Sequence, residues 1–376
     1  MNQYRRNNNA PSTQRIFVMF SVLFVIAVMM SAQYYGKTNR AVLAGNPSSP
    51  VLAIMLGLVV ALYMGMRPYS GQFFGDTGLY RHLWLMRQTA IPFVFSNQGM
   101  EPGIYFIFDV CRLTGWGYEG AQLIVDLIYV GFTVWGCVRL GKRHSLLMLV
   151  CVMSCFSFFS FGVNGWRNGM ACGIAIAALS YVTGGVASKV IAAALCLLAY
   201  QFHHSVMLPS AAMFAAAFFI KDIKWSIGFW LFSVLLSLVA GGFVEGLLGD
   251  LDTDARLHTY MAMQNNAQQM AQFSQTGFRF DFVLYSCVPI VLGYNIIKKR
   301  KIVDRTYSIL LNTYILANSF WVMVIRSSFS NRFAYLSWFM YGIVLIYPLV
   351  KMNVFSKQGQ VVAALLFGNA LLSFWI

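Results

Sequence analysis

The feature that most constrains this chain is a series of apolar segments that recurs along its whole length. Each runs for roughly 15–20 residues, which lets a helix cross a hydrocarbon layer of about 30 Å. Of the 376 residues, 59% are hydrophobic and only 10% are charged, whereas roughly a quarter of residues are charged in soluble globular domains. A water-soluble core cannot bury this much apolar surface. The sequence therefore predicts an all-α, polytopic membrane protein.

We expect about twelve transmembrane helices that form a single transmembrane domain over residues 1–376. The expected spans are 16–32, 51–66, 119–138, 145–163, 166–184, 188–202, 205–219, 225–243, 281–297, 306–325, 333–351 and 360–376. The first span follows several arginines and resembles a signal peptide. Because further spans follow it, we expect it to remain uncleaved.

Short basic turns set the expected orientation. The turns at 142–144, 221–224 and 298–301 are rich in Lys and Arg, so the positive-inside rule places them in the cytoplasm. By counting, residues 67–118 and 244–280 then form outer loops. The unusual polar residues of the chain gather on that outer side.

The apolar segment from Glu101 to Gly115 is short for a span and allows two topologies. As a re-entrant element buried in protein, it leaves residues 67–118 outside. As a thirteenth span, it moves residues 67–100 to the cytoplasm and suits the N-terminal arginines better. We expect the re-entrant form, because it keeps the polar motifs of this region on the outer side.

The net charge of +15 does not indicate a nucleic-acid partner. The cations sit mostly in turns between apolar segments, where they orient helices in a lipid membrane. The seven cysteines lie in apolar stretches, and His203-His204 has no ligand at zinc spacing nearby. We therefore predict neither a metal nor a cofactor.

Ionisable residues near the spans are candidates for a site, because they are costly to desolvate. Asp109 and Asp126 fit either a structural ion pair or a substrate path, and the sequence leaves both open. The counted topology places several arginines outside, against the positive-inside rule. These are Arg67, Arg81, Arg167, Arg326 and Arg332. Gathered together, they would suit bidentate capture of phosphate oxygens.

Five short motifs follow one another along the predicted outer side. They are Arg67 with Gly75-Asp76 and Tyr80, Glu101-Pro102-Gly103, Asn164 with Arg167 and Ala171, Phe202-His203 with Ser205, and Asn331-Arg332-Phe333-Ala334-Tyr335. In their order and their placement between spans, they resemble the EpsG-type branch of the bacterial Wzy polysaccharide polymerases. The resemblance runs from about residue 67 to residue 340, which is most of the chain.

The resemblance implies a GT-C-like fold and a metal-independent glycosyltransferase of the periplasmic face of the bacterial inner membrane. Its substrates would be undecaprenyl-diphosphate-linked oligosaccharide units, joined into O-antigen or exopolysaccharide, and a chain-length regulator would be a further partner. Asp76 or Glu101 would accept the proton of the attacking hydroxyl. Arg167, Arg326 and Arg332 would stabilise the diphosphate leaving group, and His203 would assist the phosphate or orient an arginine. The expected substrate-binding residues are Arg67, Tyr80, Arg81, Asn164, His204, Arg326, Asn331, Arg332 and Tyr335.

Two other functions compete with this interpretation. A flippase for the same lipid-linked sugar would line a central cavity with charge through the membrane depth and would often show repeated halves, but no repeat is visible. An O-antigen ligase would carry Arg and His on a large outer loop. The 244–280 loop has only Arg256, His258 and Arg279, so the ligase ranks third.

Overall fold

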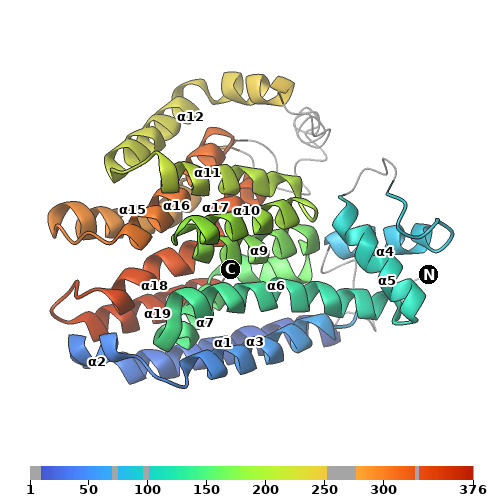
Figure 1. Cartoon of the computed structure of the whole chain (residues 1–376), viewed down its shortest axis with the longest axis horizontal. Helices are drawn as coiled ribbons and strands as arrows, with labels where there is room; N and C mark the ends of the chain where they lie inside the picture. Colours follow the sequence, from blue (N-terminus) through green and yellow to red (C-terminus); the bar gives the residue numbers. More distant parts are fainter. Residues whose placement is uncertain (1–9, 70–74, 96–100, 252–276, 327–329, 376) are drawn as a thin grey trace. The chain divides into compact units, whose positions relative to one another are not determined.

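The computed structural model describes residues 10–69, 75–95, 101–251, 277–326 and 330–375. All regular elements in these ranges are helical, which confirms the all-α prediction for the described part of the chain. The chain divides into two compact units. The first comprises residues 1–207 and 346–376, and the second comprises residues 208–345 (Figure 1).

The first unit contains the helices that carry four of the five sequence motifs. Its elements are α1 (Ala10–Tyr34), α2 (Asn39–Ala44), α3 (Ser49–Gly65), α4 (Gly75–Arg87), α5 (Pro102–Thr114), α6 (Gly117–Gly141), η1 (Lys142–His144), α7 (Ser145–Met153), α8 (Phe156–Val163), α9 (Trp166–Val182), α10 (Val186–Tyr200), η2 (His204–Val206) and α19 (Gln358–Trp375). Helix α6 packs against α3 and α9, and α1 packs against α19. A Cβ at Gly173 of α9 would collide with the Tyr129 carbonyl of α6, so the two helices approach closely because Gly173 has no side chain.

The second unit is held together by a buried polar network. Its elements are α11 (Met207–Phe218), α12 (Ile223–Leu251), α15 (Phe280–Tyr294), the π-helix η3 (Asn295–Lys299), α16 (Arg305–Met323), α17 (Ser330–Trp338) and α18 (Tyr341–Lys351), whose last residues belong to the first unit. Asn318 of α16 accepts a hydrogen bond from the Trp230 indole at 2.7 Å and donates to the hydroxyls of Ser286 and Ser337. One amide thus links α16 to α12, α15 and α17.

Several helices are long and apolar enough to cross a membrane. Among the described residues, four such segments occur, at Gly117–Met153, Ile223–Ala240, Phe280–Lys299 and Arg332–Lys351. Shorter apolar helices lie at Val18–Tyr34, Ser49–Gly65, Val186–Tyr200, His204–Phe218 and Gln358–Ser373. These helices are consistent with a membrane protein, while the number of about twelve spans stays a prediction.

Some element boundaries differ from those expected. At η1, Lys142 has φ 53°, and α7 packs back against α6. The span expected at 145–163 is divided between α7 and α8, because the α-helix is interrupted at Ser154 and Cys155. Helix α12 continues to Leu251 across a kink at Ala240, beyond the expected start of the outer loop at 244. Residues 252–276 of that loop, including Arg256 and His258, lie outside the described residues.

Helices α4 and α5 are too short to span a membrane alone. Each has 13 residues, or about 20 Å at 1.5 Å per residue. Figure 1 shows both at one end of the first unit, where α5 packs against α4 and α6. Helix α4 lies outside the expected spans, because its sequence contains several polar and charged residues. The re-entrant topology of residues 101–115 stays a prediction.

Candidate functional site

Three of the predicted catalytic residues meet in the first unit, although they are far apart in sequence. The carboxylate of Glu101 forms an ion pair with Nη1 of Arg167 through Oε2. Its other oxygen, Oε1, lies 3.0 Å from Nδ1 of His203 and accepts a long hydrogen bond from the backbone N–H of His204 at 3.4 Å. Glu101 is 2% exposed, while the side chains of Arg167 and His203 are 12% and 16% exposed. The buried carboxylate of Glu101 therefore binds both Arg167 and His203, whose side chains are partly exposed.

A close backbone contact sets the distance between Glu101 and His203. Glu101 is the N-cap of α5, and Gly103 in the first turn donates its N–H to the Gln201 carbonyl at 2.9 Å. A Cβ at Gly103 would lie 2.6 Å from the Phe202 ring and 2.8 Å from the Gln201 oxygen. Any larger residue would push α5 away from the segment that carries His203. The glycine of the Glu-Pro-Gly motif is therefore required by packing.

The segment from Asn164 to Arg167 connects α4 to this site. The Asn164 side chain accepts a hydrogen bond from the backbone N–H of Asp76 at 2.9 Å. Further along α4, the Tyr80 ring stacks on Trp166 with centroids 4.8 Å apart and planes within 7°. Two contacts thus hold α4 against the start of α9, and Asp76 lies at that junction, half-buried.

Arg67 lies buried next to the residues of this site. It is buried and donates to Asp126 at 2.9 Å and to the carbonyls of Met64 and Val163 at 2.7 and 2.8 Å. Its guanidinium also lies 6.0 Å from the Trp166 ring. Because Asp126 already balances its charge, the position of Arg67 is a supporting one. A direct contact between Arg67 and substrate stays a prediction.

Arg81 and His204 are placed at the edge of this region. The Arg81 guanidinium lies 5.2 Å from the rings of both Tyr69 and Tyr118, and it approaches Glu119 at 3.8 Å. The His204 ring stacks on Tyr200 with centroids 4.5 Å apart. The role of these two side chains in substrate binding also stays a prediction.

The remaining predicted residues belong to the second unit. Arg326 donates hydrogen bonds to the carbonyls of Ser237 and Leu238 at 3.1 and 3.3 Å. Tyr335 contacts Trp338 with ring centroids 6.0 Å apart, and Arg332 is half-buried on α17. The side chain of Asn331 lies outside the described residues. The expected gathering of these residues with Arg167 therefore stays a prediction.

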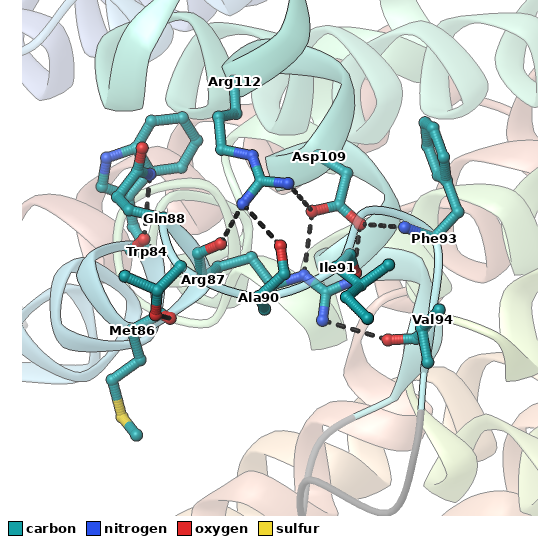
Figure 2. Close-up of polar contacts among 11 residues, drawn as sticks. Trp84, Met86, Arg87, Gln88, Ala90, Ile91, Phe93, Val94, Asp109 and Arg112 are labelled. Carbon is teal, nitrogen blue, oxygen red and sulfur yellow. Dashed lines mark hydrogen bonds and ion pairs between the residues drawn. The ribbon is translucent and has the colours of Figure 1, made fainter.

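Both acidic residues with two possible roles are in buried ion pairs. Asp126 pairs with Arg67. Asp109 pairs with Arg87 at 2.6 Å (Figure 2). Sequence reasoning did not identify either pairing, nor the supporting role of Trp166 and of Gln122, whose amide donates to the carbonyls of Gly65 and Arg67. The only available signal was the cost of burying a charge, which requires some partner but does not name it. Among the described residues, no group of three His, Cys, Asp or Glu side chains is placed to hold a metal ion.

The arrangement of Glu101, Arg167 and His203 suits proton transfer next to a bound anionic group such as a phosphate. With Nδ1 protonated and held by Glu101, the imidazole is oriented, and a positive charge on it would be stabilised by the carboxylate. Arg167 presents a fixed guanidinium, and its buried Nε has no hydrogen-bond partner among the described residues. Such a guanidinium can bind phosphate oxygens with planar, charge-assisted bonds.

Comparison with known proteins assigns the chain to a family. No curated protein and no solved structure matches it. The profile described as the EpsG family matches residues 50–376, which cover most of the chain and all five motifs. The chain therefore belongs to the EpsG family, whose members are of the polysaccharide polymerase type.

Proposed function

We propose that this chain is a metal-independent membrane glycosyltransferase with a GT-C-like fold that polymerises oligosaccharide units carried on undecaprenyl diphosphate. The reaction would take place at the periplasmic face of the bacterial inner membrane, and a chain-length regulator would be a partner. Membership of the EpsG family supports a polymerase-like function. The observation that carries the proposal further is the junction of Glu101, Arg167 and His203.

The proposed step is a displacement at the anomeric carbon of the growing chain. A hydroxyl oxygen of the incoming unit forms the new glycosidic bond, and the bond from the anomeric carbon to the lipid diphosphate breaks. The hydroxyl proton moves to a protein base, and the diphosphate leaves with the bonding electrons. Catalysis then requires a base beside the acceptor and positive charge beside the leaving group.

The geometry favours distinct roles for the three residues. Both oxygens of Glu101 already accept bonds from Arg167, His203 or the His204 amide, and two such partners weaken a carboxylate as a base. We therefore assign Glu101 to orienting His203, and His203 to accepting the proton through Nε2. Arg167 would bind the diphosphate oxygens. Asp76 is retained as the alternative base, because it lies at the same junction.

The test is the formation of polymer in a strain that lacks the gene and carries wild-type or variant chains. We expect Arg167→Ala and His203→Gln each to lower polymer formation about 100-fold or more, in line with losing a charge stabiliser or a general base. Arg167→Lys keeps the charge but loses the planar fork, so it tests the geometry if Arg167→Ala is poorly expressed. Arg305→Ala and Asp281→Asn, at exposed sites, are the matched controls.

The outcomes separate the alternatives. Loss of activity in Asp76→Asn with activity retained in His203→Gln would make Asp76 the base. Normal polymer from Arg167→Ala at wild-type protein level would refute the site. Disappearance of single units as well as polymer on deletion would indicate transport or ligation, not polymerisation.

A further inference from the structure

Residues 91–95, which follow α4, expose four large apolar side chains. Ile91 is 72% exposed, and Phe93, Val94 and Phe95 are each at least 40% exposed. The Phe93 ring contacts Phe106 of α5, itself half exposed, with centroids 5.6 Å apart. The apolar surface therefore continues from the loop onto α5. We call residues 91–95 together with Phe106 the apolar loop surface.

Several backbone groups of residues 87–94 are hydrogen-bonded by charged side chains of α4 and α5 (Figure 2). Arg87 donates to the carbonyls of Ile91 and Val94 at 3.3 and 3.1 Å. Arg112 donates to the carbonyls of Arg87 and Ala90, the latter at 3.0 Å. Asp109 accepts from the backbone N–H of Phe93 at 2.7 Å. Loop polar groups that water would ordinarily satisfy are thus paired with three ionised side chains.

Those ionised side chains are themselves removed from solvent. Arg87 is 2% exposed and Asp109 is fully buried. They form a two-bond pair, with Arg87 Nε and Nη2 at 2.8 and 2.6 Å from the two Asp109 oxygens. The Arg87 guanidinium also lies 5.6 Å from the Phe95 ring and 5.3 Å from the Tyr105 ring. The charge is inside the loop, and the aromatic and aliphatic groups are outside.

This distribution of charged and apolar side chains differs from that of a solvent-exposed loop. A surface loop in water needs no buried charges for its carbonyls, and it gains nothing from four exposed apolar side chains in a row. At the boundary between lipid headgroups and acyl chains, a segment can bury its apolar side chains among the acyl chains while water still reaches its remaining backbone groups. Phe93 also has φ 58°, a left-handed conformation that is unfavourable for a bulky residue, and its amide is held there by Asp109.

We propose that the apolar loop surface inserts at the boundary between the lipid headgroups and the acyl chains, where acyl chains cover Ile91, Phe93, Val94, Phe95 and Phe106. The position of the apolar loop surface supports this proposal. Helix α5 packs against α6. The apolar segment that is long enough to cross the membrane begins at Gly117, three residues after α5 ends. The proposal does not depend on the enzymatic reaction. It would fix the depth of α5, and so of Glu101 at its first turn, relative to the membrane surface.

The test measures the surroundings of spin labels on the full chain in liposomes. Labels are attached to Ile91→Cys and, separately, to Val94→Cys, and their collision rates with oxygen and with a water-soluble nickel chelate are compared. Met55→Cys on the exposed apolar side of α3 is the lipid reference, and Lys221→Cys in a basic turn is the water reference. The unsubstituted chain gives the background, since six of its seven cysteines are buried.

We expect the oxygen-to-nickel ratio at Ile91 and Val94 to lie nearer the Met55 value than the Lys221 value. A ratio nearer that of Lys221 would show a loop in water and overturn the proposal. Low collision rates with both reagents would show that protein covers the loop, either a partner or a second copy of the chain, and would also overturn it.

Discussion

Replacing Asp109 with asparagine should detach the loop between α4 and α5 without unfolding the rest of the first unit. The carboxylate balances the buried Arg87 guanidinium and accepts the Phe93 amide. Removing one partner of a buried ion pair costs about 3–5 kcal/mol, because the other charge stays buried and unbalanced. Asparagine keeps one acceptor oxygen, so we take the lower end, about 3 kcal/mol. At about 1.4 kcal/mol per factor of ten, local opening should increase about 100-fold.

Cys111 provides the readout for this opening. It is fully buried on α5, two residues beyond Asp109, and burial raises the pKa of its thiol to about 11. At neutral pH it should therefore react with a thiol-alkylating reagent only when α5 opens. The alkylation rate at Cys111, followed by mass spectrometry of the protein in liposomes, should rise about 100-fold in Asp109→Asn. The rate at Cys172 in α9, also fully buried, should not change.

A matched substitution shows what would refute this reasoning. Asp281→Asn removes a carboxylate that is 59% exposed and paired with Arg279, and exposed pairs contribute only about 0–1 kcal/mol. If Asp109→Asn accelerates Cys111 alkylation no more than Asp281→Asn does, the buried pair does not hold the loop. An equal rise at Cys111 and Cys172 would show global unfolding and would contradict a local role.

Two further predictions follow from named contacts. Gly103→Ala should lower polymer formation at least about tenfold with protein level retained, because its Cβ would meet the Phe202 ring and the Gln201 carbonyl, and overpacking of this kind costs about 1–3 kcal/mol. Gly131→Ala, with nothing within 4 Å, is the control, and equal activity of the two variants would contradict the role of the close contact. The backbone N–H of Lys224 and the Lys298 ammonium lower the pKa of Asp222, so its stabilising effect should be complete above the ordinary Asp pKa near 4 and disappear as pH falls through the lowered value. Unfolding midpoints of the wild type should decline across that window more than those of Asp222→Asn, and parallel curves would disprove the assignment.

The sequence alone determined the helical class and the position of most apolar helices. The spans expected at 51–66 and 306–325 lie within two residues of α3 and α16. Such agreement is possible because the length and apolarity of a membrane helix are properties of a continuous segment. The same criterion does not detect helix α4, because α4 is not a continuous apolar segment. Its sequence is polar, and it is held by stacking on Trp166 and by the Asp76–Asn164 bond, neither of which is local.

The candidate site was partly visible in the sequence as well. Glu101, Arg167 and His203 could be selected as ionisable residues of the motifs, but their mutual contacts could not. The tertiary structure decided that Glu101 joins Arg167 to His203, that Asp126 balances Arg67, and that Asp109 balances Arg87. An arginine can pair with any carboxylate that the fold brings near it. Apolarity is therefore readable from the segment that carries it, whereas charge pairing is fixed only when helices distant in sequence are packed together.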